Sequence, residues 1–161
     1  AVNIAPTLQE KADIAQNAID LARALGVERP KVAVLCATES VNPSMPATLD
    51  AAALSKMADR QQIRGGEIDG PLAFDNAISR EAAEQKGIVS RVAGDADILL
   101  APDIEAGNML YKELTWLAGA GTAGLVLGTR VPVLLTSRSD SMEARVNSCA
   151  VSVLYARALA G

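Results

Sequence analysis

The sequence contains no histidine, and this absence narrows the chemistry that the chain can perform. Ser-His-Asp and Cys-His triads, zinc sites with histidine ligands and phosphohistidine intermediates are all excluded. Any catalysis must therefore use carboxylates, hydroxyls, lysine or arginine side chains, backbone dipoles or groups of the substrate itself.

Aromatic residues are scarce, at 2% of the chain, although hydrophobic residues make up 50% of it. A core built from such a sequence is aliphatic and rich in alanine, which lets helices pack closely on a sheet. The two cysteines, Cys36 and Cys149, lie in apolar patterns. We expect both to be buried free thiols in a reducing cytoplasm.

Excess basic charge and long apolar runs are lacking as well. The net charge is −4, from 15 basic and 19 acidic residues, which argues against a nucleic-acid partner. The most apolar stretch, Leu117–Gly128, contains four glycines and is shorter than the roughly 20 residues of a membrane helix. The first residues show no basic region followed by an apolar run, so no signal peptide is expected.

The spacing of apolar residues predicts an α/β fold. The segment 7–25 has helical periodicity and a Thr-x-x-Glu capping box, and Lys31–Cys36 is an apolar run typical of a buried strand. Further helices are expected at 48–59, 74–78, 80–86 and 107–118, and further strands at 63–68, 98–101, 125–127 and 133–135. Thr48 is the expected cap of its helix. The alternation predicts a three-layer αβα arrangement with a mostly parallel sheet, in which the two strands around Gly128 are either an antiparallel pair or parallel neighbours.

A final helix is expected from about Ser139 to Leu159. Asp140 and Glu143 have the spacing of a second capping box. Helical spacing directs one set of side chains toward the core: Met142, Val146, Cys149, Ala150, Val153 and Leu154.

Polar side chains at the expected strand ends mark a candidate site, because ligands of open α/β sheets bind beyond the carboxyl ends of the strands. Ser137 and Arg138 lie between the last strand and a helix, whose N–H groups and dipole favour an anion such as phosphate. The guanidinium adds a planar fork that matches phosphate oxygens. Asp103, Asn108 and Lys112 form a second polar group around a helix start. Solvated charges and helix caps are the alternative interpretation of both groups.

Two other patterns have plainer interpretations. Asp75 follows the turn signal Asp69–Pro71, and its spacing favours helix capping. The run Gly119–Gly124 matches G-x-G-x-x-G in letters, but it follows a helix and precedes a strand, which reverses the dinucleotide-binding order. We interpret these glycines, together with Gly107 and Gly128, as turn and close-packing positions.

Four segments resemble the phosphate acetyl/butyryltransferase family: Ser40–Thr48, Asp69–Ser79, Ala96–Ala120 and Val126–Arg138. The similarity runs along essentially the whole chain, and residues 137–141 resemble the butyryl-type branch or the phosphotransacetylase domain joined to an enoyl-CoA hydratase-like domain. The resemblance implies a reversible reaction in which acyl-CoA and phosphate give acyl phosphate and CoA. It also implies an isocitrate/isopropylmalate dehydrogenase-like fold with the site in a cleft between two domains. A cytoplasmic homodimer is expected, with coenzyme A as substrate and no metal or other cofactor.

The resemblance also suggests roles for individual residues. Ser137 is expected to hydrogen-bond the transition-state oxyanion or the thiol, and Arg138 to hold phosphate or the carbonyl oxygen. The implied substrate-binding residues are Asn108, Tyr111, Lys112, Asp75 and Gly128. Acetyl-type members place an aspartate base six residues after the arginine, where this chain has Ala144. Asp140 or Glu143 would have to substitute for it, and helix capping is the alternative role of both.

Members of the family are about twice as long as this chain. We therefore expect residues 1–138 to be the second α/β domain of the transferase. Residues 139–161 would be a helix that belongs to, or packs on, a first domain of the same polypeptide, and would expose apolar surface without it. The alternatives are a non-catalytic domain that senses acyl-CoA or acyl phosphate, as in some malic enzymes, and a dehydrogenase of related fold. The dehydrogenase is disfavoured because the sequence lacks the acidic metal cluster that it needs.

Overall fold

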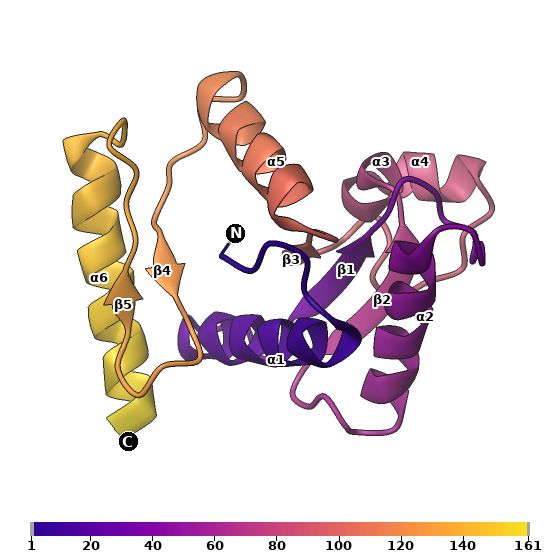
Figure 1. Ribbon diagram of the computed structural model, residues 1–161, viewed down its shortest axis with the longest axis horizontal. Coiled ribbons are helices and arrows are strands. Elements are labelled where there is room, and N and C mark those ends of the chain that lie inside the picture. The colour runs from indigo at the N-terminus through magenta and orange to yellow at the C-terminus, as the bar shows by residue number, and fades with distance from the viewer. Residues whose placement is uncertain (1, 161) are drawn as a thin grey trace.

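The computed structural model describes residues 2–160 and contains a three-stranded parallel sheet in the order β2-β1-β3 (Figure 1). The strands are β1 (Lys31–Leu35), β2 (Glu67–Leu72) and β3 (Ile98–Leu100). β1 pairs with both neighbours, and its last four residues are all buried. A central parallel strand is covered on both faces, which explains why its sequence is a continuous apolar run. The prediction of an α/β fold with a mostly parallel sheet is confirmed.

Helices cover both faces of this sheet. They are α1 (Leu8–Ala24), α2 (Pro46–Asp59), α3 (Phe74–Ile78) and α4 (Arg80–Gln85). Val32 of β1 packs with residues of α1 and α2, such as Ile19 and Leu54, in one core cluster. Ala33 belongs to a second cluster with Ala77 of α3 and residues of α4. Alternate side chains of β1 thus point to opposite layers.

The start of α1 forms as its sequence predicts. The Thr7 hydroxyl accepts a hydrogen bond from the Glu10 backbone N–H, at 3.4 Å, and the Glu10 carboxylate accepts one from the Thr7 N–H, at 2.7 Å. The backbone N–H of Thr7 is the main cause that lowers the pKa of the Glu10 carboxyl. The capping box is therefore confirmed.

The C-terminal third of the chain forms a separate hairpin and two longer helices. These elements are α5 (Ile104–Trp116), β4 (Leu125–Val126), β5 (Val133–Leu134) and α6 (Met142–Ala160). β4 and β5 pair antiparallel, which decides between the two arrangements that the sequence allowed. In Figure 1 the hairpin lies alongside α6, at the opposite end of the molecule from α2. No helix among residues 2–160 combines the length and the apolar character needed to cross a bilayer.

Several predicted boundaries and caps are wrong. α5 begins at Ile104 rather than at residue 107. α2 begins at Pro46, and Thr48 is fully buried inside it, where its hydroxyl donates to backbone carbonyls instead of capping the helix. The edge strand spans Glu67–Leu72 rather than 63–68. The predicted turn signal Asp69–Pro71 lies inside this strand. A Cβ at Gly70 would lie 2.8 Å from the Cβ of Val34, so glycine lets β2 approach β1 closely.

The predicted inward face of α6 is also wrong. Met142 and Val146 are 77% and 58% exposed, and the remaining members of that set, Cys149 included, are exposed as well. The buried residues are Ala144, Ser148, Ser152 and Tyr155. Small residues at this spacing allow the hairpin to approach the helix backbone, and the Ser148 hydroxyl accepts the Gly124 N–H at 2.9 Å. Cys149 is therefore not a buried thiol, whereas Cys36 is half-buried and burial raises its pKa.

Candidate functional site

A tight turn between β5 and α6 holds Ser137 and Arg138. The Asp140 carboxylate accepts the Ser137 backbone N–H at 2.6 Å, and the Asp140 N–H donates to the Ser137 carbonyl at 3.1 Å. The Ser137 hydroxyl lies 3.1 Å from that of Ser139. These bonds fix the backbone of Ser137. The side chain of Arg138 is exposed and makes no hydrogen bond or ion pair within residues 2–160.

The turn replaces the predicted capping box. α6 begins at Met142, and its first turn is capped by the Ser141 hydroxyl, which accepts the Ala144 N–H at 3.1 Å. Asp140 is engaged with Ser137 instead, and Glu143 is exposed. The sequence analysis missed the contact between Asp140 and the Ser137 backbone, because the spacing of Asp140 also fits a helix cap.

α5 brings two of the predicted substrate-binding residues to this turn. The Tyr111 hydroxyl lies 3.5 Å from Oδ1 of Asp140, at the outer limit of a hydrogen bond. The Lys112 Nζ lies 5.3 Å from the centre of the Tyr111 ring, within the range of a cation–π interaction. Asn108 is exposed one turn earlier on the same helix. Tyr111 therefore reaches the Ser137 turn through Asp140, and Lys112 lies beside the Tyr111 ring.

A polar pocket of about 370 Å³ adjoins the same turn. Its lining comes from the end of α5, the glycine-rich link and the start of α6: Thr115, Trp116, Gly119, Ala120, Gly121, Thr122, Ser139, Asp140, Ser141, Glu143, Ala144 and Asn147. Hydroxyls and two carboxylates dominate this list. The polar pocket includes Ala144 and both carboxylates considered as substitutes for the missing base, Asp140 and Glu143, together with Gly119 and Gly121 of the glycine run.

Asp75 lies in a different cluster, beyond the carboxyl ends of β1 and β2. Its carboxylate pairs with Lys86 at 3.0 Å, and Lys86 also contacts Glu39 at 3.4 Å. The hydrogen bond with Lys86 is the largest cause that lowers the pKa of Asp75, and the same bond raises the pKa of Lys86. Asn76 is fully buried beside them and donates to Glu39 at 3.3 Å. Asp75 does not cap α3, whose N-cap is Ala73.

Gly128 lies at the hairpin turn, at the other end of β5 from Ser137. Its φ angle is +82°, and a Cβ there would come within 2.9 Å of the Asn17 side chain. This conformation and close approach are the structural reason for a glycine at this position. A role for Gly128 in binding substrate stays a prediction.

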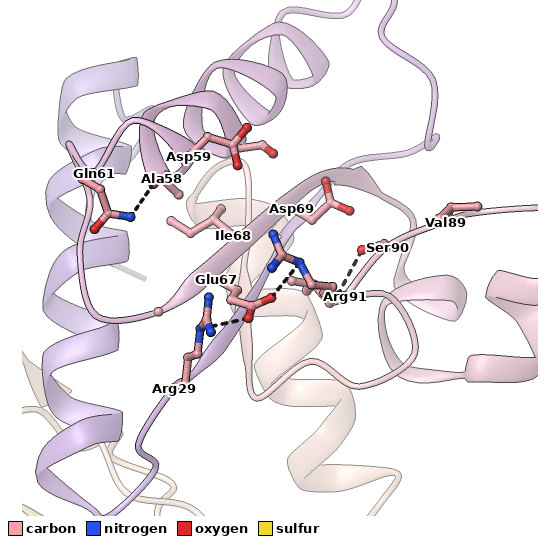
Figure 2. Close-up of a pocket in the computed structure, with 13 residues that line it drawn as sticks. Arg29, Ala58, Asp59, Gln61, Glu67, Ile68, Asp69, Val89, Ser90 and Arg91 are labelled. Carbon is pink, nitrogen blue, oxygen red and sulfur yellow. Dashed lines mark hydrogen bonds and ion pairs between the residues drawn. The ribbon is translucent and has the colours of Figure 1, made fainter.

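A larger cavity, of about 530 Å³, lies elsewhere, along the outer edge of β2. Figure 2 shows Arg29 and Arg91 turned toward Glu67, which they contact at 2.9 and 3.4 Å. Because Glu67 starts the strand, the cavity lies at the amino end of β2, opposite to the edge where α/β sheets bind ligands. Its arginines are also paired to a carboxylate. We therefore place the candidate site at the Ser137 turn.

No group of three or more Cys, Asp or Glu side chains within residues 2–160 converges on a point suited to a metal ion. The chemistry available at the turn is that of the Ser137 hydroxyl on a fixed backbone, an unpaired guanidinium and the Tyr111 phenol, with the Lys112 ammonium group beside the phenol ring. Such groups bind and polarise phosphate and carbonyl oxygens.

Known proteins resemble this chain over nearly its whole length. It is 61% identical to a phosphate acetyltransferase from Rhizobium meliloti over 97% of this chain and 49% of the relative. It is 54% identical to a phosphate butyryltransferase from Clostridium acetobutylicum, over 97% of this chain and 52% of the relative. The crystal structure of a branched-chain phosphotransacylase from Enterococcus faecalis matches with a TM-score of 0.88 and 42% identity, over 97% of this chain and 56% of that one.

The chain thus spans about half the length of the curated relatives that it matches. The family model for phosphate acetyl/butaryl transferase matches residues 1–153. With a match over nearly all of its residues and relatives above half identity, the chain belongs to the phosphate acetyl/butaryl transferase family.

Proposed function

We propose that the protein containing this chain transfers an acyl group between coenzyme A and phosphate. A phosphate oxygen attacks the carbonyl carbon of acyl-CoA, and the resulting tetrahedral oxyanion collapses as the carbon–sulfur bond breaks. The products are acyl phosphate and CoA thiolate, which takes up a proton from solvent. Phosphate and thiolate are both nucleophiles in their own right, so the protein mainly orients them and stabilises charge.

The observation that carries this proposal is the fixed Ser137 turn with an unpaired guanidinium beside it. Asp140 holds the Ser137 backbone at 2.6 Å, and Arg138 has no partner among residues 2–160 to compete with an anion. In this proposal Arg138 binds the phosphate or the carbonyl oxygen. The Ser137 hydroxyl donates to the oxyanion as it forms.

The neighbouring side chains have supporting roles in the proposal. Asp140 is a positioning residue, because its two oxygens face the Ser137 N–H and the Tyr111 hydroxyl. Lys112 and Asn108 line the approach for the anionic substrate from α5. Asp75, with its partner Lys86, contributes a second wall beyond the ends of β1 and β2.

We further propose that α6 packs on a part of the polypeptide that the relatives have outside the matched half. Met142 and Val146 are 77% and 58% exposed on one side of the helix, an apolar surface that a partner would cover. An isocitrate/isopropylmalate dehydrogenase-like arrangement of two domains fits this expectation. We also propose that the protein is a cytoplasmic homodimer that needs no metal or other cofactor. Turnover that survives dialysis against EDTA would support the part of this proposal that concerns metal.

The test is a CoA-release assay with acyl-CoA and phosphate on the protein as it is encoded. Arg138→Ala should lower kcat/KM by about 30-fold or more, which corresponds to about 2 kcal/mol of transition-state stabilisation. Arg130→Ala is the matched control, because Arg130 is also exposed but lies in the hairpin turn with Gly128. Equal activity of both variants would remove Arg138 from the mechanism.

A second function, binding of acyl-CoA or acyl phosphate without turnover, is favoured by one observation. Ala144 is 6% exposed where acetyl-type members carry an aspartate, so this chain has no carboxylate at that position. Calorimetry separates the two functions. Binding of acyl-CoA with no CoA release, in the presence of phosphate, would identify a sensing domain.

A further inference from the structure

An apolar cleft of about 300 Å³ separates α5 from the N-terminal segment and the start of α1. Its apolar side chains include Ile14 of α1, Leu99 of β3, and Leu110 and Leu114 of α5, and the Tyr111 ring closes one part of it. We infer that this cleft binds the acyl chain of the thioester, and that Leu114 helps to set the chain length that the protein accepts. The inference rests on the proposed acyl transfer and deepens it.

One face of α5 supplies one wall of the cleft. Gly107, Leu110, Tyr111 and Leu114 are spaced so that they lie along one side of the helix. A helix face with this pattern is usually packed into a core. In α5, however, no residue is fully buried, and Leu114 is 38% exposed. Leu110 of this face packs against the second core cluster, whereas Leu114, one turn later, borders open space.

The floor of the cleft is part of the main core and holds its shape. Ile14 packs against the core cluster of α1 and α2. Leu99 and Leu110 pack against the second cluster, on the other side of the sheet. Because both clusters surround the central strand, the floor is fixed, and a change in Leu114 at the rim alters the volume of the cleft without removing core contacts.

Tyr111 connects the cleft to the proposed reaction centre. Its ring lines the cleft, while its hydroxyl lies 3.5 Å from Asp140, whose other oxygen holds the Ser137 N–H at 2.6 Å. The apolar space thus begins one side chain away from the turn where the carbonyl carbon would react. An acyl group with its carbonyl at Ser137 would direct its alkyl tail along the Tyr111 ring.

The chemistry of the lining favours an alkyl chain over a polypeptide segment. Only Asn3, Asp103 and Tyr111 contribute polar side chains, and Asp103 already accepts the Ala106 N–H at 2.8 Å as the cap of α5. A peptide in the cleft would leave backbone N–H and C=O groups facing leucine side chains without partners. A volume of about 300 Å³ is at the small end of ligand sites, which suits a short acyl chain.

The experiment compares kcat/KM for acetyl-, butyryl- and hexanoyl-CoA in the encoded protein and in Leu114→Phe and Leu114→Ala. A ratio between substrates cancels any loss of active protein. A methylene in an apolar pocket changes specificity by about 10–200-fold. We expect Leu114→Phe to lower the butyryl-to-acetyl ratio at least tenfold and Leu114→Ala to raise the hexanoyl-to-butyryl ratio. Leu25→Phe is the matched control, because Leu25 is 45% exposed and follows the opposite end of α1.

Substrate ratios that stay constant in both Leu114 variants would overturn the inference. If Tm also fell while the ratios stayed constant, the result would indicate that polypeptide fills the cleft. If the unaltered protein turns over no acyl-CoA, the proposed transfer itself fails, and calorimetry then decides on the cleft. Tighter binding of butyryl-CoA than of CoA, abolished by Leu114→Phe, would support the site. Equal binding of the two ligands would overturn it.

Discussion

The ion pair between Lys11 of α1 and Asp50 of α2 provides a sharp test of how burial sets the value of a charge pair. Lys11 Nζ lies 2.7 Å from the Asp50 carboxylate, and the two side chains are 7% and 27% exposed. Coulomb's law at this distance gives about 6 kcal/mol with an effective dielectric constant of about 20, and the desolvation of both ions offsets much of it. What a mutation costs therefore depends on which charge it leaves behind.

Asp50→Ala leaves an ammonium group buried without a partner, and we expect it to lower the free energy of unfolding by about 3–4 kcal/mol. Lys11→Met leaves a carboxylate that water can reach, and the methionine refills the apolar space. We therefore expect a cost of about 1–2 kcal/mol for this variant. Since Asp50→Ala strands the more deeply buried charge, combining both substitutions should cost less than Asp50→Ala alone.

Urea unfolding of the 161-residue chain, followed by circular dichroism, measures these free energies. Lys56→Met is the matched control, because Lys56 pairs with Asp59 at the same 2.7 Å distance while both side chains are more than half exposed. That variant should cost about 0–1 kcal/mol. Equal costs for Lys11→Met and Asp50→Ala would refute the reasoning, as would a control as costly as either.

Two further substitutions test local features of the fold. The lowered pKa of Asp75 stabilises the chain above the ordinary carboxyl value of 3.8, and this contribution is lost as the pH falls through and below it. Lys86→Met removes the largest cause of this shift. The variant should therefore have a lower unfolding free energy than the unaltered chain at about pH 7, and the difference should shrink progressively below about pH 4. Gly128→Ala should cost about 1–2 kcal/mol in urea unfolding, because of its positive φ and the nearby Asn17, whereas Gly121→Ala, with open space around it, should cost less than half as much.

The parts of the fold that the sequence predicts well are those decided by neighbours along the chain. The run Lys31–Cys36 has no polar interruption after its first residue, and only a strand covered on both faces suits it. The capping box of Thr7 and Glu10 needs only four consecutive residues. Such signals are complete within a short window, so no knowledge of tertiary contacts is needed to interpret them.

The orientation of α6 could not be predicted in the same way. Its sequence offers two faces, one of large apolar side chains and one of small residues that ends in Tyr155. A hydrophobic pattern selects the first face. The hairpin instead packs on the second, because Ser148 satisfies the Gly124 N–H and the small side chains permit close approach. The contact depends on backbone geometry that a pattern of hydrophobicity does not represent.

The resemblance supplies the members of the candidate site, which stay predictions, but not the contacts between them. The resemblance named Ser137, Tyr111 and Lys112 as site residues. The link through Asp140 joins positions 29 residues apart, and nothing local to either position indicates it. Spacing alone could not distinguish an Asp140 that caps α6 from one that holds the Ser137 backbone, because both uses place an acceptor near the start of the same helix.

Ala144 lies in the first turn of α6, close to the Ser137 turn in the chain. It is 6% exposed on the packed face of α6, and it lines the polar pocket together with Asp140 and Glu143. An aspartate at this position would place a third carboxylate among two others in a confined space, which raises the cost of its ionised form. In the proposed attack of phosphate on acyl-CoA no general base is needed, because phosphate is already an anion at neutral pH and attacks without losing a proton first. Under the proposed function, the loss of the aspartate is then compatible with turnover, provided that Arg138 positions the phosphate and Asp140 keeps the Ser137 turn in place.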